Sequence, residues 1–380
     1  MTQNIARPTK IWDQTLNDWV YLAGVVDTTK SYTYTADQTF PGITATSYNG
    51  GPIVGRNFIL NGGFDIWQRG TSVTSSSGFL NTTFLADRWS AYYYGGGNTA
   101  NYTMSRQDQV PAAIPGYESQ YFIRHAFPAG NATTYWEWNH RIEDVRTLAG
   151  QTVTFSYWAK NTGTVNPTIE IQQNFGSGGS TTNYAYLGSP TIGNTWQRYS
   201  WTTTLGSIAG KTIGAGSYLQ FKLYFGPTAG TVTAFNLDID NVQLEIGPVA
   251  TQFTRQNISY QAELAACHRY YWQTTSSPNG AVTLMTGGLA SGTANVAQSY
   301  CAFPSPMRTI PTASINSTNL QFWDATGGGA GYSVGAILAQ NSSIYQGTLN
   351  IASSGLTNNN RYNLLALTGS TGFLAFSAEL

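Results

Sequence analysis

From Arg56 to about Gln256 the chain consists of short segments in which polar and apolar residues alternate, separated by clusters of Gly, Asn, Ser and Pro. In the segment Gln151–Ala159, Val153, Phe155 and Tyr157 point to one side of an extended chain, and the residues between them point to the other. The same alternation occurs in Pro167–Gln173, Trp196–Thr204 and Ser217–Phe225. About two hundred residues of this texture, without a helical period, predict a two-sheet antiparallel β-sandwich of the jelly-roll kind.

One segment, Ile258–Trp272, has a helical pattern. It is rich in Ala, Leu, Gln and Glu, contains neither Gly nor Pro, and repeats apolar residues at three-to-four-residue spacing. We predict a short helix that links two β-regions. Its apolar seam could associate threefold as a coiled segment, but fifteen residues give barely two heptads, so packing on its own sandwich is favoured.

The two ends of the chain have textures of their own. Ile11-Trp12 and the segment Trp19–Val26 flank the turn Asn17-Asp18, which predicts a hairpin followed by an extended arm. After residue 276 short apolar segments resume between Gly/Ser/Asn-rich loops, which predicts a small β domain. We therefore expect an all-β protein, and its predicted parts are an N-terminal arm (1–55), a sandwich (56–256), a linking helix (257–275) and a C-terminal β tip (276–380).

The low number of charged residues and the zero net charge exclude some classes of function. The 18 basic and 18 acidic residues make up only 9% of the 380 residues and cancel to zero, against roughly 25% charged residues in ordinary soluble domains. No cationic surface is available to hold phosphate backbones, so we expect no nucleic-acid partner. The N-terminus lacks the apolar core of a signal peptide, and no run approaches the ~18 apolar residues of a membrane span. We expect a soluble product made in the cytoplasm, without membrane insertion.

Three stretches in a fixed order resemble a known family. The run Arg56-Asn-Phe-Ile-Leu-Asn-Gly-Gly-Phe-Asp-Ile-Trp-Gln-Arg-Gly70, the tetrapeptide Ala86-Asp-Arg-Trp89 and the closing run Phe235-Asn-Leu-Asp-Ile-Asp-Asn-Val-Gln-Leu-Glu-Ile-Gly247 resemble the carbohydrate-binding-module-like domain of bacteriophage and prophage tail fibres. The segment Phe253–Trp272 is similar to the one that follows that domain. Residues 280–380 are outside the resemblance.

The resemblance implies a jelly-roll module in a homotrimeric tail fibre that contacts a host surface polysaccharide or lipopolysaccharide. Lys10-Ile-Trp-Asp and Asp18-Trp-Val are similar to short virion-attachment segments. The N-terminus is thus expected to bind tail or baseplate proteins, and the mature protein is expected in the virion after synthesis in the host cytoplasm.

A sugar site needs aromatic platforms beside hydrogen-bonding groups, because sugars present apolar C–H faces ringed by hydroxyls. The chain has 52 aromatic residues, the sum of 11 Trp, 24 Tyr and 17 Phe. The candidate platforms are Trp136 and Trp138 on one predicted strand, Trp158, the loop-borne pair Tyr184 and Tyr186, and Tyr92. The alternative for the tryptophans is that they fill the sandwich core.

Asp238 and Asp240 share one face of a predicted strand, with carboxyls about 6–7 Å apart. They could act as a glycosidase pair, or be turn carboxylates held by hydrogen bonds. As hard-oxygen ligands the two aspartates could also share a Ca²⁺ with Asp65 and nearby carbonyls such as that of Asn61. Related jelly rolls place a structural Ca²⁺ between their opening and closing strands, so the resemblance implies Asp65 and Asp240 as ligands. No other cofactor is required.

Catalytic motifs give no support to enzyme chemistry. The sequence has no GxSxG elbow, no Walker loop, no dinucleotide fingerprint and no zinc-type His spacing. We therefore predict a receptor-binding tail fibre subunit that is not an enzyme. The alternatives are a tailspike depolymerase that cuts surface polysaccharide, although no repeat of 20–50 residues indicates a β-helix, and a purely structural fibre of the virion or baseplate.

Overall fold

The computed structural model describes residues 9–13, 18–22, 47–48, 51–52, 57–76, 78–94, 101–116, 119–129, 135–164, 166–226, 233–257, 259–275, 281–290, 296–318, 320–325, 331–367 and 372–380. The chain divides into two compact units, Met1–Asn49 and Gly50–Leu380. Most of the predicted N-terminal arm lies outside the described residues.

The first unit contains a β-hairpin. Strands β1 (Thr9–Asp13) and β2 (Asp18–Leu22) pair antiparallel, and Trp12 lies opposite Trp19. The pairing confirms the predicted hairpin, but Asp18, placed in the turn by the sequence pattern, is the first residue of β2, and residues 14–17 lie outside the described residues. Two further strands of two residues each, β3 (Ser47–Tyr48) and β4 (Gly51–Pro52), follow in the chain.

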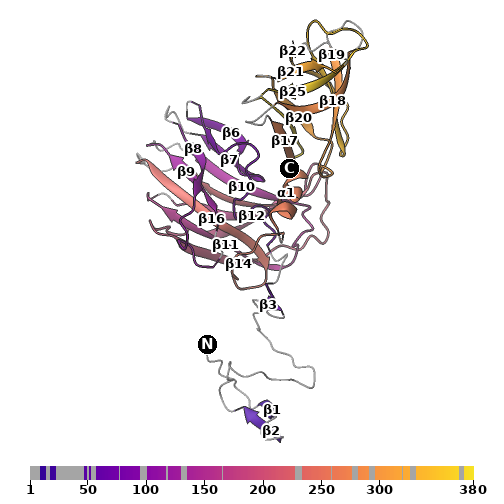
Figure 1. Cartoon of the computed structure of the whole chain (residues 1–380). Coiled ribbons are helices and arrows are strands. Elements are labelled where there is room, and N and C mark those ends of the chain that lie inside the picture. The colour runs from indigo at the N-terminus through magenta and orange to yellow at the C-terminus, as the bar shows by residue number, and fades with distance from the viewer. Residues whose placement is uncertain are drawn as a thin grey trace. The chain divides into compact units, whose positions relative to one another are not determined.

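The second unit begins with a β-sandwich of two six-stranded antiparallel sheets, drawn as stacked layers in Figure 1. The strands of sheet 1 run in the order β13 (Asn183–Gly188), β12 (Thr168–Asn174), β15 (Tyr218–Phe225), β10 (Tyr135–Glu143), β7 (Trp89–Tyr94) and β6 (Phe79–Phe84). Those of sheet 2 run in the order β14 (Gln197–Thr204), β11 (Thr152–Asn161), β16 (Phe235–Ile246), β9 (Tyr121–Phe127), β8 (Thr103–Asp108) and β5 (Ser72–Thr74). The all-β sandwich prediction is confirmed.

Aromatic side chains fill the space between the two sheets. Trp138 of β10 stacks on Trp89 of β7, with ring centroids 4.0 Å apart and planes 10° apart. Phe155 of β11 stacks on Phe221 of β15 across the core, at 3.7 Å between centroids. Val153, Phe155 and Tyr157 are fully buried, as the alternation along β11 predicts. Burying one such side chain contributes about 1.5–3 kcal/mol to folding.

The helix is shorter than the sequence pattern predicts. Helix α1 spans Tyr260–His268, and Ser259 caps it by accepting a hydrogen bond from the Ala262 amide. Leu264 and Cys267 pack with Leu60 and Ile66, so the helix contacts its own sandwich. Residues Tyr271–Thr275, partly included in the predicted helix, form strand β17 instead. Aromatic and β-branched residues favour this strand, and pairing with β26 supplies its hydrogen bonds.

The C-terminal region is also built from antiparallel strands. Sheet 3 runs in the order β22 (Gly331–Ser333), β21 (Leu320–Asp324), β25 (Arg361–Ala366), β18 (Val282–Ala290), β19 (Val296–Ala302), β24 (Gln346–Ala352) and β23 (Ile337–Gln340). Sheet 4 places β26 (Phe373–Ser377) between β17 and β20 (Thr312–Asn316). A second apolar cluster, which includes Phe322, Leu364 and Phe376, forms the core of this region.

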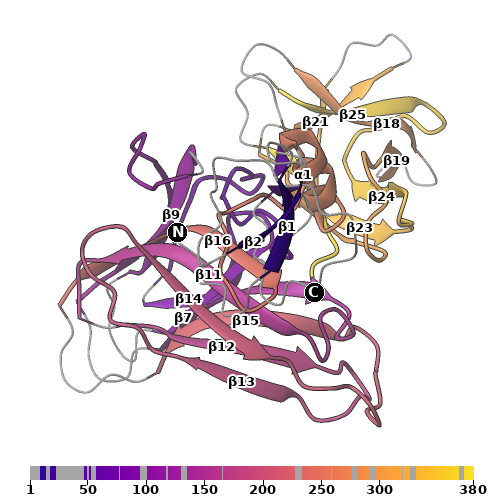
Figure 2. The same ribbon diagram turned by 90° about the horizontal axis from the view of Figure 1, so that it is seen from below.

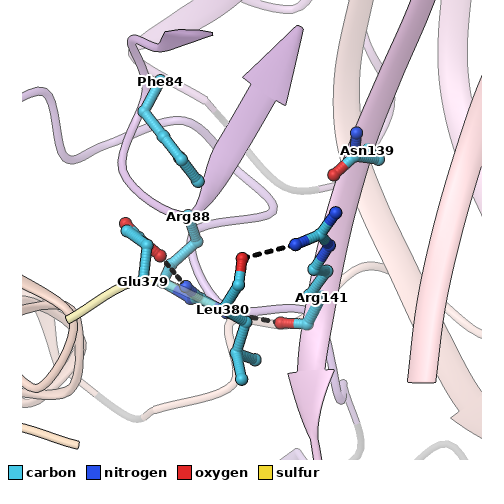
Figure 3. A pocket seen from close by; sticks show the side chains of 6 residues that line it. All are labelled: Phe84, Arg88, Asn139, Arg141, Glu379 and Leu380. Atoms are coloured by element: carbon cyan, nitrogen blue, oxygen red, sulfur yellow. Dashed lines mark hydrogen bonds and ion pairs between the residues drawn. The ribbon is translucent and has the colours of Figure 1, made fainter. Parts of the chain in front are cut away.

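The last two residues lie against sheet 1 of the sandwich (Figure 3). The Glu379 carboxylate pairs with Arg69, at 2.8 Å, and with Arg88. Arg141 of β10 donates to the Leu380 carbonyl, and the Arg88 guanidinium lies 3.5 Å from the centre of the Tyr270 ring. The Arg88 side chain is only 2% exposed. These contacts therefore form a buried ionic junction between the C-terminal region and the sandwich.

Arg88→Ala should destabilise the protein by about 3–5 kcal/mol, because it leaves a buried carboxylate with one of its two arginine partners missing. The matched control is Arg146→Ala, which removes an exposed pair with Asp144 and should cost less than ~1 kcal/mol. Urea unfolding followed by tryptophan fluorescence measures both variants. Equal losses in the two variants would contradict the structural importance of the junction.

Candidate functional site

The outer face of sheet 1, turned away from the sandwich core, carries seven tyrosines on four strands. The tyrosines are Tyr92 and Tyr94 of β7, Tyr135 of β10, Tyr184 and Tyr186 of β13, and Tyr218 and Tyr224 of β15. They reach this side because their neighbours in sequence, such as Tyr93, Trp136 and Leu223, point into the core. We call this surface, with the polar side chains between these rings, the tyrosine face.

The strand register sets polar side chains side by side across the tyrosine face. Tyr186 lies opposite Glu170 of β12, Glu170 opposite Lys222 of β15, Lys222 opposite Asn139 of β10, and Asn139 opposite Ser90 of β7. Figure 2 shows β13, β12 and β15 side by side in this order. Because adjacent strands are ~4.8 Å apart, this row spans four strand spacings across the sheet.

A second row runs beside the first. Tyr184 lies opposite Gln172, Gln172 opposite Gln220, and Gln220 opposite Arg141. Arg141 donates from Nε to Gln220 Oε1 at 2.9 Å. Arg141 also donates to the Leu380 carbonyl and Gln220 is only 4% exposed, so the second row is held mainly by hydrogen bonds within the protein.

The rings of Tyr184 and Tyr186 form an exposed aromatic pair at the edge of sheet 1. Their centroids are 6.4 Å apart and their planes differ by 11°. Tyr184 is 55% exposed and Tyr186 is 65% exposed. Two nearly parallel, solvent-exposed rings offer apolar faces against which the C–H face of a sugar ring can pack.

A charged cluster lies next to this pair. The Lys222 ammonium is 3.3 Å from Glu170 Oε1 and 3.8 Å from Glu137 Oε2. Gln172 donates to Glu170, and the Tyr135 hydroxyl donates to Glu137 at 2.7 Å. The Glu170 side chain is only 3% exposed although it is on the outer face. Longer side chains therefore surround it, and the pairing with Lys222 compensates its burial.

The Glu170 carboxylate of this cluster contributes to a raised pKa at two tyrosine hydroxyls. The nearby Glu170 carboxylate raises the pKa of Tyr186, and burial followed by Glu170 raises the pKa of Tyr224. A phenol is protonated at neutral pH even at its ordinary pKa of about 10. The raised pKa of Tyr186 reflects its interaction with Glu170, and the rings remain as apolar surfaces for a hydroxylated ligand.

Tyr92 joins the tyrosine face on its far side from Tyr184. Its ring meets Tyr135 edge to face, with centroids 5.9 Å apart. It lies opposite Glu137 in the register of β7 and β10. Of the six predicted platforms, the structure thus brings Tyr92, Tyr184 and Tyr186 to one face of one sheet.

Trp136 and Trp138 must be corrected as candidate platforms, because both are completely buried in the core. Trp138 stacks on Trp89, and Trp136 packs against Phe225 at 5.4 Å between ring centroids. No ligand reaches rings in this position. Trp158 is half-buried on β11 of sheet 2, opposite Asp240 and Arg198, so it does not belong to the tyrosine face.

The atoms assigned to calcium have other partners. The Asn61 carbonyl accepts hydrogen bonds from Trp89 Nε1 at 3.0 Å and from the Phe64 amide at 3.2 Å. Asp65 pairs with Arg255 Nε at 2.8 Å. Asp240 accepts hydrogen bonds from Gln109 and from the Asn241 amide. Across the part of the chain that the structure describes, no three His, Cys, Asp or Glu side chains gather to hold a metal. These protein partners favour internal hydrogen bonds over calcium, and the chelator experiment described below tests the predicted site.

The neighbouring Asp238 is also engaged, as both of its oxygens accept hydrogen bonds from the Arg124 guanidinium, at 2.7 and 2.8 Å. Lys160 lies 3.5 Å away from the same carboxylate. Asp238 and Asp240 thus match the description of carboxylates held by internal hydrogen bonds, which the sequence left open as an alternative.

Several residues of the tyrosine face were not identified from the sequence, among them Glu170, Lys222, Gln172 and Tyr224. All four occupy alternate positions of two strands that the pattern does predict, Pro167–Gln173 and Ser217–Phe225. The alternation therefore contained the signal for which residues face outward. It did not show that β12 and β15 are neighbours.

Comparison with known proteins gives matches of structure alone. Neither a protein-family model nor a curated protein sequence matches the chain. One similar structure is the enzymatically active domain of tailspike protein 4 of bacteriophage CBA120, at 15% identity and TM-score 0.31. The match covers 50% of this chain and 21% of that one, so the chain spans about a fifth of that domain's length.

Two other similar structures are smaller modules. The family 11 carbohydrate-binding module from Clostridium thermocellum, in complex with a β-1,3-1,4-mixed-linked tetrasaccharide, is 12% identical with a TM-score of 0.28, and the match covers 45% of this chain and 95% of that one. The N-terminal cellulose-binding domain of Cellulomonas fimi β-1,4-glucanase C is 21% identical with a TM-score of 0.25, and the match covers 35% of this chain and 84% of that one. Each likeness covers at most half of this chain.

No helix among the described residues is both long and apolar enough to cross a membrane.

Asp240→Asn should change the pH dependence of stability. Burial raises the pKa of Asp240 from its ordinary value to about 7, and the Asp65 carboxylate contributes in the same direction. The folded protein therefore binds this proton more tightly than the unfolded chain, and the associated stability is lost as pH rises from about 4 to about 7. Relative to the native protein, the variant should gain stability over this range, by at most a few kcal/mol at ~1.4 kcal/mol per pKa unit.

Thermal unfolding of the variant and of the native protein at several pH values measures this difference. Burial also raises the pKa of Asp87 to about 6, but the contribution of Asp87 to the pH dependence is the same in both proteins and drops out of the comparison. A chelator added at pH 7.5 should leave the melting temperature unchanged. A lower melting temperature with the chelator, together with a variant that loses stability as pH rises, would instead indicate a bound metal ion at Asp240.

Proposed function

We propose that this chain is a tail fibre subunit of a bacteriophage or prophage that binds a host surface glycan through the tyrosine face without cleaving it. The observation that carries the proposal is the exposed pair of nearly parallel rings, Tyr184 and Tyr186, beside the Glu170–Lys222 cluster. Apolar rings next to hydrogen-bonding groups are the combination that a saccharide requires. The virion role follows from the sequence resemblance, and residues 1–55 attach the subunit to the tail or baseplate.

The subunit acts as a homotrimer in this proposal. One shallow face with a few exposed rings binds a sugar chain weakly. Three such faces on one fibre act at high effective concentration once the first has engaged, which strengthens the overall attachment without any new contact. A polysaccharide or lipopolysaccharide offers the repeated units that this kind of binding needs.

The charges on the tyrosine face fit binding better than hydrolysis. A glycosidase needs one carboxyl that donates a proton and a second that acts as base or nucleophile. Here Glu137 and Glu170 both contact the ammonium of Lys222. The two carboxylates thus share one environment instead of two contrasting ones, which suits fixed hydrogen-bond acceptors.

Tyr186→Ala and Tyr184→Ala should each weaken adsorption to host polysaccharide about tenfold, because the loss of each ring removes roughly 1–1.5 kcal/mol of stacking free energy. The control is Tyr345→Ala in the C-terminal region, whose side chain is also 65% exposed and which should bind as the native protein does. Pull-down on immobilised host polysaccharide measures all three. Loss of binding in Tyr345→Ala alone would move the receptor site to the C-terminal region.

Incubating the native protein with host polysaccharide should leave the length of the sugar chains unchanged. Size-exclusion chromatography of the polysaccharide and a reducing-end assay measure this outcome. Glu170→Gln is the companion variant, since it keeps the shape of the side chain and removes its charge. Shortened chains with the native protein that stay intact with Glu170→Gln would show a depolymerase. Adsorption by neither protein would favour a structural fibre.

A further inference from the structure

A pocket of about 400 Å³ opens at the edge of the sandwich, where β13 of sheet 1 meets the end of β14 in sheet 2. We call it the edge pocket. Its volume is near the lower end of the ~300–1,000 Å³ that small-molecule sites occupy. Residues from three segments line it, namely Ile171, Gln173, Thr182, Asn183, Tyr184, Ala185, Thr204, Leu205 and Gly206.

Two amide side chains converge where Gly206 has no side chain. A Cβ atom at this glycine would lie 2.9 Å from Gln173 Oε1 and 3.3 Å from Asn183 Nδ2. Gln173 is only 3% exposed, and its Nε2 donates to the Gly206 carbonyl at 2.9 Å. This hydrogen bond fixes the amide plane, so that Oε1 is held as an acceptor beside the Asn183 donor.

The other lining side chains include apolar ones. Ile171 is 1% exposed and Leu205 is 3% exposed, and both belong to the sandwich core. Ala185 packs against the same core from β13. The pocket thus combines apolar residues with the amides of Gln173 and Asn183, as a small amphipathic ligand requires.

None of the nine lining residues carries a charge. A charged ligand group taken out of water here would find no opposite charge to compensate its desolvation. A purely apolar ligand would offer no partner to Gln173 Oε1 or Asn183 Nδ2, at a cost of about 1–3 kcal/mol for each group taken out of water. A neutral ring with hydroxyl groups on an apolar frame satisfies both constraints.

We propose that the edge pocket binds one neutral sugar residue, a terminal or branch unit of the glycan whose main chain lies on the tyrosine face. Tyr184 connects the two sites, because it lines the pocket and also stacks beside Tyr186. The proposal rests on the proposed function for the identity of the glycan. It extends that function by assigning part of the specificity to Gln173, Asn183 and the open position at Gly206.

The test uses saturation-transfer NMR on the full chain with the methyl glycosides of glucose, galactose, mannose, rhamnose and N-acetylglucosamine as probes. At least one of them should give a signal with the native protein. Gly206→Val fills the pocket and should abolish this signal. Asn183→Ala removes one amide without adding volume and should weaken binding about fivefold, the equivalent of one hydrogen bond worth ~1 kcal/mol.

Tyr345→Ala is the matched control, because Tyr345 is an exposed ring of the C-terminal region that neither lines the pocket nor belongs to the tyrosine face. It should leave both the monosaccharide signal and the adsorption to polysaccharide unchanged. Asn183→Ala keeps the test decisive if Gly206→Val does not fold, which thermal unfolding shows.

Two results would overturn the edge pocket as a sugar site. One is the absence of a signal from all five glycosides with the native protein, and the other is a signal that both pocket variants retain in full. Neither result touches the tyrosine face, which is judged by polysaccharide adsorption. Conversely, a monosaccharide signal that depends on Asn183, found with a protein that adsorbs to no polysaccharide, would support the pocket and refute the proposed function.

Discussion

The burial of Trp136 and Trp138 between the two sheets is the constraint on which the candidate site depends. Trp138 stacks on Trp89, so the register of β10 against β7 is fixed by large rings that fit only inside the core. Because side chains alternate, Glu137 and Asn139 must then face outward. A slip of one residue would bury both polar groups and expose both indoles. The positions of the polar groups on the tyrosine face therefore follow from the aromatic core beneath it.

Much of this arrangement could be predicted from the sequence, and the limit lies in which strands become neighbours. The alternation in Pro167–Gln173 and Ser217–Phe225 predicts both strands and their two faces, and the exposed pair Tyr184 and Tyr186 was predicted from its loop-proximal position. The side of β10 that faces the core could not be predicted, since Trp-Glu-Trp fits a core and a binding surface equally well. The Glu170–Lys222–Glu137 cluster requires β12, β15 and β10 to be adjacent, although they are far apart in the chain.

The same limit explains the error at the end of the helix. Periodicity from Ile258 to Trp272 continues past His268, and no Gly or Pro marks a stop. The chain becomes extended at Tyr271 because strand β26, about a hundred residues later, pairs with it. The pairing also brings Glu379 to the buried arginines of the sandwich. Neither contact is visible in a local sequence pattern. Strand β26 pairs with a strand about one hundred residues before it, and Glu379 contacts arginines that lie about three hundred residues before it.

The tyrosine face has the same low net charge as the chain as a whole. On the tyrosine face the positive charges of Lys222 and Arg141 offset the negative charges of Glu170 and Glu137, so the face presents directed hydrogen-bonding groups with little net charge. Affinity must then come from ring area and short-range hydrogen bonds, which salt hardly screens. Under the proposed function, such a face would discriminate ligands by the shape and hydroxyl pattern of each unit instead of by charge. It would then bind one chain weakly, and attachment would become firm only when several copies engage a repeating polymer.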